Sequence, residues 1–146
     1  MKDTEEQLDE IQSSDSQSPE DMSPLTYDVI GAAQKVHRTL GPGFTESVYQ
    51  AALVKELMLR KIAFQSQQEF HVVYEQTLCG TYRADIVVGN AVILELKAVS
   101  SVCPEHKAQL VSYLKASGLP TGLLLNFGAT SLQIRRYSLR SLKQSL

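Results

Sequence analysis

Three segments of the chain carry apolar residues at helical spacing. They cover residues 24–40, 45–61 and 104–118, and we expect a helix over each. Ser23 and Thr45 can cap the first two helices through their side-chain oxygens. Glycine and proline residues follow the first and third segments, which is typical of helix ends.

The remaining apolar segments have the character of strands. Residues 64–74 predict one strand, and residues 83–98 predict a β-hairpin with two more. After the third helix, residues 121–126 resemble a buried strand and residues 132–137 an edge strand. The order ααβββαββ therefore predicts an α/β fold.

Three ionisable residues lie within residues 83–98, the most apolar stretch of the chain: Asp85, Glu95 and Lys97. Side chains alternate along a strand, so Glu95 and Lys97 share one face with Ile93, and the opposite face is wholly apolar. A strand with apolar residues on both faces is covered on both sides. Because an unpaired buried carboxylate costs several kcal/mol, Glu95 must meet a partner or a metal.

The turn at residues 89–90 leaves two registers open for this hairpin. With a two-residue loop, Asp85 lies opposite Leu94 and the carboxylates point to opposite faces. With a three-residue loop at 89–91, or a bulge, Asp85 lies opposite Glu95, with Cβ atoms about 4.5–5.5 Å apart. Repulsion between such carboxylates is relieved by protonating one or by binding a divalent cation. The alternative is a solvated face that carries a weak ion pair.

The charge of the chain changes sign near residue 23. Residues 1–23 carry eight acidic side chains and one lysine, and the rest of the chain has a net charge of +5 within an overall −2. The first segment has few large apolar residues, so we expect a disordered acidic tail over residues 1–23 and one domain over residues 24–146. The basic domain is compatible with a polyanionic ligand and equally with a solvated surface.

Two further features bear on the compartment. No apolar run reaches the roughly 18–20 residues of a membrane-spanning helix, and the acidic N-terminus does not resemble a secretory signal, so we expect a cytoplasmic protein without membrane contact. Cys79 and Cys103 lack the spacing of zinc ligands relative to the histidines, which predicts free thiols.

Polar residues on the predicted helices could join the hairpin carboxylates. Glu46, in the first turn of the second helix, is either a ligand that faces inward or a residue that stabilises the helix dipole. Gln109 and Tyr113 lie one helical turn apart on the third helix and could serve structure or substrate. His106 precedes them in the first turn, where histidine is typically a surface residue.

Four short motifs occur in order along the chain. They are Gly43-Phe-Thr-Glu46-Ser-Val-Tyr49, Tyr82-Arg-Ala-Asp85, Ile93-Leu-Glu95-Leu-Lys97-Ala and Gln109-Leu-Val-Ser-Tyr113-Leu. Together they resemble the bacterial GxxExxY proteins over residues 25–137. That family looks like a minimal branch of the PD-(D/E)xK nuclease superfamily, whose restriction-endonuclease-like αβββαβ core has a mixed central sheet flanked by helices. One departure is Ala84, which stands where the superfamily commonly has proline.

The resemblance implies a Mg²⁺- or Mn²⁺-dependent nuclease that hydrolyses phosphodiester bonds in DNA or RNA. Asp85, Glu95 and Lys97 take the positions of the metal-binding and catalytic motif, and Glu46 takes that of the first-helix acid. Asp85, Glu95, Glu46 and the Leu96 carbonyl are the metal ligands that it implies.

The remaining site residues follow from the same resemblance. Gln109 and Tyr113 are similar to the QxxxY motif of RecB-type exonucleases, which adds Gln109 to the expected catalytic residues. The residues expected to bind substrate are Tyr113, Tyr49, Arg83 and Lys107, with Arg135 and Arg136 as weaker candidates. Nucleic acid is the expected partner, and a homodimer is left open.

Two other classes of function are compatible with the sequence. The first is a catalytically silent nucleic-acid- or protein-binding module that retains the nuclease fold, which would not bind Mg²⁺ at Asp85 and Glu95. The second is cysteine chemistry at Cys103, beside a helix start, although the chain has no evident oxyanion donor motif.

Overall fold

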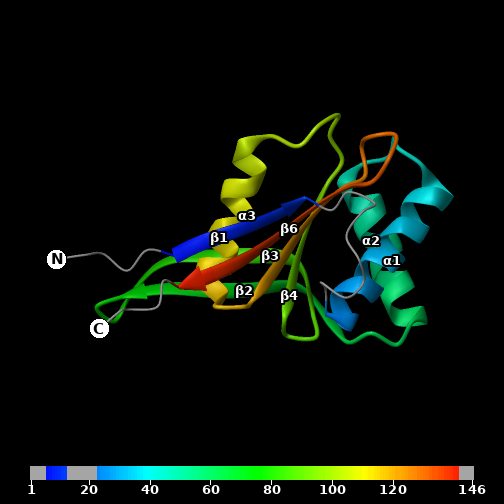
Figure 1. Ribbon diagram of the computed structural model, residues 1–146. Coiled ribbons are helices and arrows are strands. Elements are labelled where there is room, and N and C mark those ends of the chain that lie inside the picture. The colour runs from blue at the N-terminus through cyan, green and yellow to red at the C-terminus, as the bar shows by residue number, and fades with distance from the viewer. Residues whose placement is uncertain (1–5, 13–22, 142–146) are drawn as a thin grey trace.

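A single mixed sheet organises the computed structural model, which describes residues 6–12 and 23–141 (Figure 1). In chain order its elements are β1 (Glu6–Gln12), α1 (Pro24–Leu40), α2 (Glu46–Leu59), β2 (Phe64–Tyr74), β3 (Thr77–Val88), β4 (Val92–Lys97), α3 (Pro104–Ser117), β5 (Thr121–Asn126) and β6 (Gln133–Ser141). The strands lie in the order β1-β6-β5-β4-β3-β2. Strands β4 and β5 are parallel, and the other neighbours are antiparallel.

From residue 24 onward, the observed elements follow the predicted order, and the α/β fold with its αβββαβ core is confirmed. The Ser23 side chain caps α1 by accepting a hydrogen bond from the Thr26 N–H at 3.1 Å. Gly118 ends α3 in a left-handed conformation with φ 69°. Thr45 stands at the N-cap of α2 but makes no side-chain capping bond, because its hydroxyl instead contacts that of Ser47 at 3.1 Å.

The N-terminal strand differs from the sequence-based expectation. Residues 6–12 form β1, which pairs with β6 from Glu6↔Ser141 to Gln12↔Arg135. The described part of the expected acidic tail is therefore a strand, and residues 1–5 and 13–22 lie outside the described residues. Because β1 covers β6, the strand predicted at 132–137 is an inner strand and not an edge strand.

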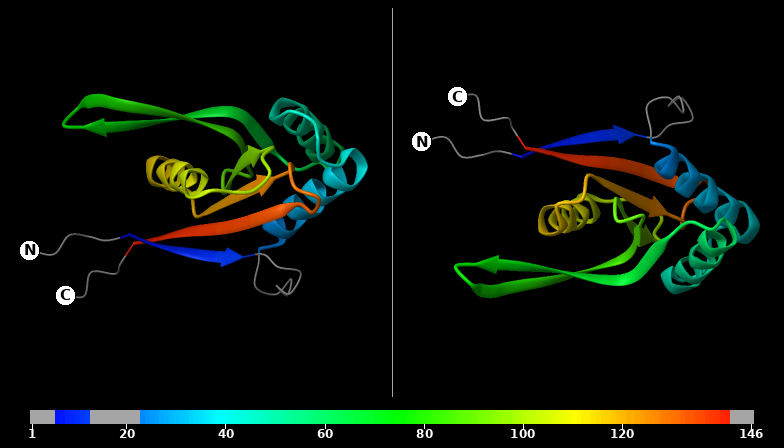
Figure 2. Two further views of the ribbon diagram at one scale, coloured as in Figure 1. Left: turned by 90° about the horizontal axis from the view of Figure 1, so that it is seen from above. Right: turned by 90° about the horizontal axis from the view of Figure 1, so that it is seen from below.

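The sheet separates two apolar cores. Helices α1 and α2 cover one face, where Val92, Leu94 and Leu96 of β4 contribute to the larger core. Helix α3 covers the opposite face, where Leu110 and Leu114 pack in the smaller core. Figure 2 shows α3 between the long β2–β3 hairpin and strands β5 and β6. The predicted alternation of β4 is thus observed, with a second apolar layer behind Ile93.

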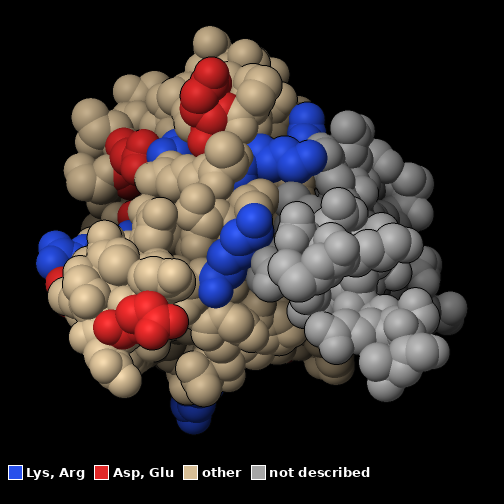
Figure 3. Space-filling model, turned by 90° about the vertical axis from the view of Figure 1, so that its left-hand side faces the viewer, with Lys and Arg blue, Asp and Glu red and all other residues tan. Residues whose placement is uncertain are grey.

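The surface charge is mixed on the side shown in Figure 3. Over the described residues of that side, acidic and basic side chains are interspersed with uncharged surface and do not gather into one basic area. In the described part of the chain, no helix combines the length and apolarity needed to cross a bilayer.

Candidate active site

The β3–β4 hairpin adopts the register that brings the two carboxylates together. The paired residues are Val88↔Val92, Val87↔Ile93 and Ile86↔Leu94, which leaves a three-residue loop at 89–91. The next position of this register sets Asp85 opposite Glu95, at the point where the ladder between the strands ends.

Each carboxylate bonds a backbone amide of the facing strand. The Leu96 N–H donates to Asp85 Oδ2 at 2.9 Å, and the Asp85 N–H donates to Glu95 Oε1 at 3.3 Å. Within the described residues, Asp85 Oδ1 and Glu95 Oε2 make no hydrogen bond or ion pair. One oxygen on each side chain is therefore available to a ligand.

A local distortion of β2 and β3 accompanies this arrangement. Ala84 and Val87 both contribute to the core beneath α3, whereas Ile86 contributes to the core on the other face. Regular alternation would put Ala84 and Val87 on opposite faces, so the pleat is interrupted at Asp85. The facing strand is irregular at the same level, where Gln67 has a left-handed φ of 55°. Such backbone is uncommon for a residue other than glycine and concentrates at functional sites.

Burial and like charge make the carboxylates unusually basic. Glu95 is only 2% exposed, and burial followed by the charge of Asp85 raises its pKa to about 8. Partial desolvation is also the main cause that raises the pKa values of the half-buried Asp85 and of Glu46, which stays largely exposed, while the charge of Lys97 opposes both shifts. Glu95 is therefore largely protonated at neutral pH in the free protein, and further positive charge would favour its ionised form.

Glu56 is a buried acid of this chain whose charge is paired with two basic side chains. Its side chain forms ion pairs with Lys35 at 3.2 Å and with Arg60 at 2.8 Å, and bonding to Arg60 is the main cause that lowers its pKa. No lysine or arginine of the described residues lies within ion-pair distance of Glu95. A buried acid with a strongly raised pKa and no paired cation is typical of a functional site.

A residue of helix α3 binds the side chain of Lys97, which ends β4. Lys97 Nζ donates to Gln109 Oε1 at 2.9 Å, and Gln109 Nε2 donates to the Tyr113 hydroxyl at 3.1 Å. Tyr113 is 8% exposed and packs edge-on against Tyr82, with ring centroids 5.5 Å apart. The predicted residues Lys97, Gln109 and Tyr113 therefore form one chain of hydrogen bonds beside the carboxylates.

Glu46 approaches the site from the first turn of α2. Its side chain is exposed, and the charges of Lys97, Asp85 and His106 all act on its pKa. Gln50, one turn later, donates to the Asp85 carbonyl at 3.4 Å and ties α2 to β3. The hairpin, α2 and α3 thus converge on one place, and Gln50 is a contact that the sequence did not predict.

Tyr49 has a structural position and does not face a ligand. It is fully buried and stacks on Phe127, with ring centroids 4.8 Å apart. Its hydroxyl donates to the Gly41 carbonyl and accepts from the Phe44 N–H. These two bonds fix the loop that leads into Glu46, so Tyr49 supports the site from beneath and its predicted contact with substrate does not fit its burial.

Tyr49→Phe is expected to lower the free energy of unfolding by about 1–3 kcal/mol, because two partly buried backbone groups lose their partner. Thermal or urea unfolding measures this loss, and Tyr74→Phe, at a 70% exposed tyrosine, is the matched control. An unchanged unfolding free energy together with a raised KM would instead support a substrate-binding role.

The predicted basic contacts are already engaged within the protein. Arg83 is exposed and forms an ion pair with Glu69 at 2.6 Å. The Lys107 ammonium lies 5.6 Å from the centre of the Tyr137 ring. His106 Nδ1 accepts from the Cys103 N–H at 3.2 Å and closes a capping box at the start of α3. This gives His106 a structural partner and leaves Arg83 and Lys107 at the surface without a defined role in the site.

Asn126 is a buried residue beside the site that sequence reasoning missed. It pairs with Lys97 across β4 and β5, accepts from the Val99 N–H at 3.0 Å and donates to the Val99 carbonyl at 2.9 Å. It therefore fixes the chain directly after Lys97. The available signal was a polar amide at the end of an apolar strand, which was interpreted only as the strand's last residue.

The donor set fits a hard divalent cation of the kind that nuclease folds use. Mg²⁺ takes one or two carboxylates and completes its shell with water and phosphate oxygens, and Asp85 and Glu95 each have one oxygen available. As they stand, the described residues do not form a group of three acidic, histidine or cysteine side chains that could hold an ion by themselves. The site thus consists of two carboxylates, those of Asp85 and Glu95, and Glu46 lies near them.

One of three comparisons with known proteins found a match. Neither the curated proteins nor the solved structures include a significant match. The sequence pattern that defines the PD-(D/E)XK nuclease superfamily matches residues 23–137, which include the hairpin, α2 and α3. Because that match covers well over half of the sequence, the chain belongs to the PD-(D/E)XK nuclease superfamily.

Proposed function

We propose that this protein is a metal-dependent nuclease of the GxxExxY type that hydrolyses phosphodiester bonds in DNA or RNA. The observation that carries the proposal is the pair formed by Asp85 and Glu95. The buried carboxyl group of Glu95 faces the half-buried one of Asp85, each keeps one oxygen available, and Lys97 is held beside them. A structural role alone gives no reason to bury Glu95 without a countercharge.

Asp85 and Glu95 would hold Mg²⁺ or Mn²⁺, with Glu46 and the Leu96 carbonyl as further proposed oxygen ligands. When bound, such a cation supplies Lewis acidity toward a phosphate and makes nearby water more acidic. The carboxylates then serve as ligands in their ionised form. Burial and the charge of Asp85 raise the pKa of Glu95 in the free protein, and a bound cation would offset both by favouring the ionised form.

Lys97 is the proposed catalytic cation of the chain itself. Its ammonium would orient the attacking water or neutralise the negative charge that develops on the phosphate. Gln109 touches Lys97 and Tyr113, so we assign it the role of a positioning residue that holds the ammonium toward the carboxylates. Tyr113 is the last residue of this series of hydrogen bonds, and we propose that its hydroxyl also contacts the nucleic-acid backbone.

Nucleic acid is the proposed partner and the cytoplasm the proposed compartment, where the two unpaired thiols of Cys79 and Cys103 would stay reduced. We expect no membrane partner. A homodimer remains a proposal without a defined interface.

Incubating the purified protein with single- and double-stranded DNA and RNA, with Mg²⁺ or Mn²⁺ and with EDTA, tests this function. Cleavage of at least one substrate that stops in EDTA is the expected result. Binding of nucleic acid without cleavage of any substrate under any of these conditions would favour the catalytically silent module instead.

A further inference from the structure

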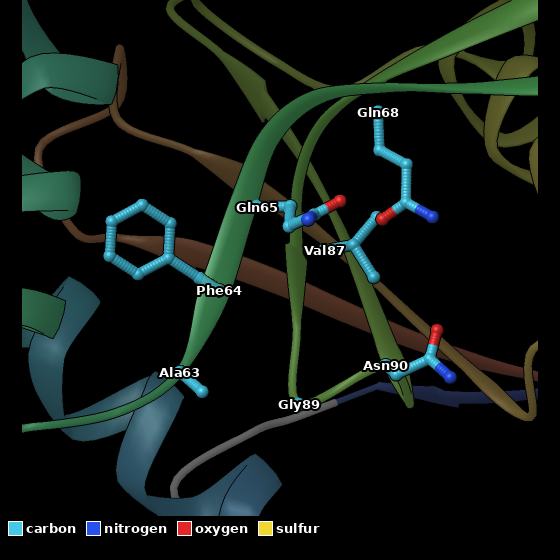
Figure 4. Close-up of a pocket in the computed structure, with 7 residues that line it drawn as sticks. All are labelled: Ala63, Phe64, Gln65, Gln68, Val87, Gly89 and Asn90. Carbon is cyan, nitrogen blue, oxygen red and sulfur yellow. The ribbon is translucent and has the colours of Figure 1, made fainter.

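A pocket of about 550 Å³ adjoins the catalytic hairpin (Figure 4). The start of β2 forms one wall, and Val87 of β3 and the β3–β4 turn complete it. Its volume lies within the range of small-ligand pockets, about 300–1,000 Å³. Neither the metal site nor Lys97 belongs to its lining.

The lining is uncharged and combines apolar surface with side-chain amides. Three side-chain amides, those of Gln65, Gln68 and Asn90, surround the buried side chain of Val87. Figure 4 shows these four side chains on one side of the strands, whereas the Phe64 ring points to the other side, toward the helices. None of the seven lining residues is charged, so the pocket suits a neutral ligand and not a phosphate.

The distorted backbone at the level of Asp85 creates this set of amides. In a regular strand, Gln65 and Gln68 would point to opposite faces, because they are three residues apart. Gln67 between them has φ 55°, and both neighbouring glutamines line the pocket. The distortion of β2 and β3 that frees Asp85 from the ladder therefore also brings two amides together.

The pocket lies at a distance that suits the next unit of a bound strand. Val87 is two residues from Asp85 along β3, which corresponds to about 7 Å. Side-chain amides carry a donor and an acceptor side by side and can match the edge of a base, as glutamine and asparagine do with adenine.

We propose that this pocket receives an unpaired nucleobase of the substrate strand, next to the phosphate that lies at Asp85 and Glu95. The inference rests on the proposed nuclease function and gives it a substrate class: single-stranded or locally opened nucleic acid, because a base paired in a duplex hides the edge that the amides would read. The amides hold the base, Val87 contacts its apolar face, and the sugar-phosphate backbone runs toward Lys97.

The test compares a short single strand with an abasic strand of equal length and charge. Binding is measured by fluorescence anisotropy in EDTA, and kcat/KM for cleavage is measured in Mg²⁺. We expect wild-type protein to prefer the base-bearing strand by about tenfold or more in either measurement. The double variant Gln65→Ala/Gln68→Ala should lose this preference. Gln34→Ala, at an exposed glutamine on α1, should retain it.

The outcomes separate the two proposals. If wild type cleaves both strands equally, or if the double variant keeps the preference, the base pocket is refuted while the nuclease function stands. If wild type prefers the base-bearing strand but cleaves neither, the pocket stands and the nuclease function falls. If the protein neither binds nor cleaves either strand, both are refuted. Gln65 is exposed and Gln68 is half-buried, so we expect thermal unfolding to change little.

Discussion

Lys97→Ala is expected to lower kcat/KM for phosphodiester cleavage by at least about a hundredfold, since one preorganised group that stabilises transition-state charge typically contributes this much. The fold should survive, because Lys97 ends β4 and is only half-buried. Asp85→Asn should cause a loss at least as large, since the amide keeps the shape of the side chain but removes a ligand charge.

Matched controls separate these effects from general changes of charge. Lys55→Ala and Asp28→Asn alter exposed residues of the same types on α2 and α1 and should leave cleavage unchanged. Single-turnover kinetics with excess enzyme, together with thermal unfolding, measure both properties. If Lys97→Ala cleaves at the wild-type rate, Lys97 is not catalytic and the proposed mechanism is wrong.

Glu95→Gln is expected to stabilise the metal-free protein, most strongly at alkaline pH. The pKa of Glu95 is about 8 in the folded protein, against an ordinary value of 4.5. Between these values the folded state binds more protons at this site than the unfolded state, so the stability that Glu95 contributes is complete below about pH 4.5 and falls as the pH rises through 8. A glutamine does not titrate and removes this loss.

The difference should reach on the order of a few kcal/mol at pH 8 to 9 and shrink toward pH 5, with a melting temperature about 5 °C or more above wild type at the alkaline end. Urea unfolding in EDTA at several pH values measures it. Glu75→Gln, at an exposed position in the β2–β3 turn, is the control. If the unfolding free energies of wild type and Glu95→Gln change in parallel with pH, the pKa of Glu95 is not raised in the folded protein.

Local patterns predicted most of the fold because each depends on neighbouring residues. The two faces of β4 followed from period-two alternation, and the ends of α1 and α3 followed from Ser23 and Gly118. Strand β1 could not be foreseen in this way. An acidic, weakly apolar segment gains its order from pairing with β6, which is distant in sequence and leaves no local signal.

The site was predictable in its residues but not in its geometry. The turn at 89–90 allowed two registers, and only packing of alternate residues against both cores selects the three-residue loop. The motif that contains Tyr49 predicted a substrate contact for this residue but did not predict that its ring is buried against Phe127. The left-handed conformation of Gln67 has no signature in the sequence, because glutamine rarely adopts it.

In the proposed mechanism, Asp85 and Glu95 together hold a divalent cation. Isothermal titration of Mn²⁺ into metal-free protein at pH 7.5 tests it most directly, with release of protons as a second readout, because ionised Glu95 must replace its protonated form on binding. We expect wild type to bind Mn²⁺ with proton release, Asp85→Asn to bind at least about tenfold more weakly, and Asp28→Asn to match wild type. If Mn²⁺ does not bind to wild type, or binds equally tightly to Asp85→Asn, Asp85 and Glu95 do not form a metal site.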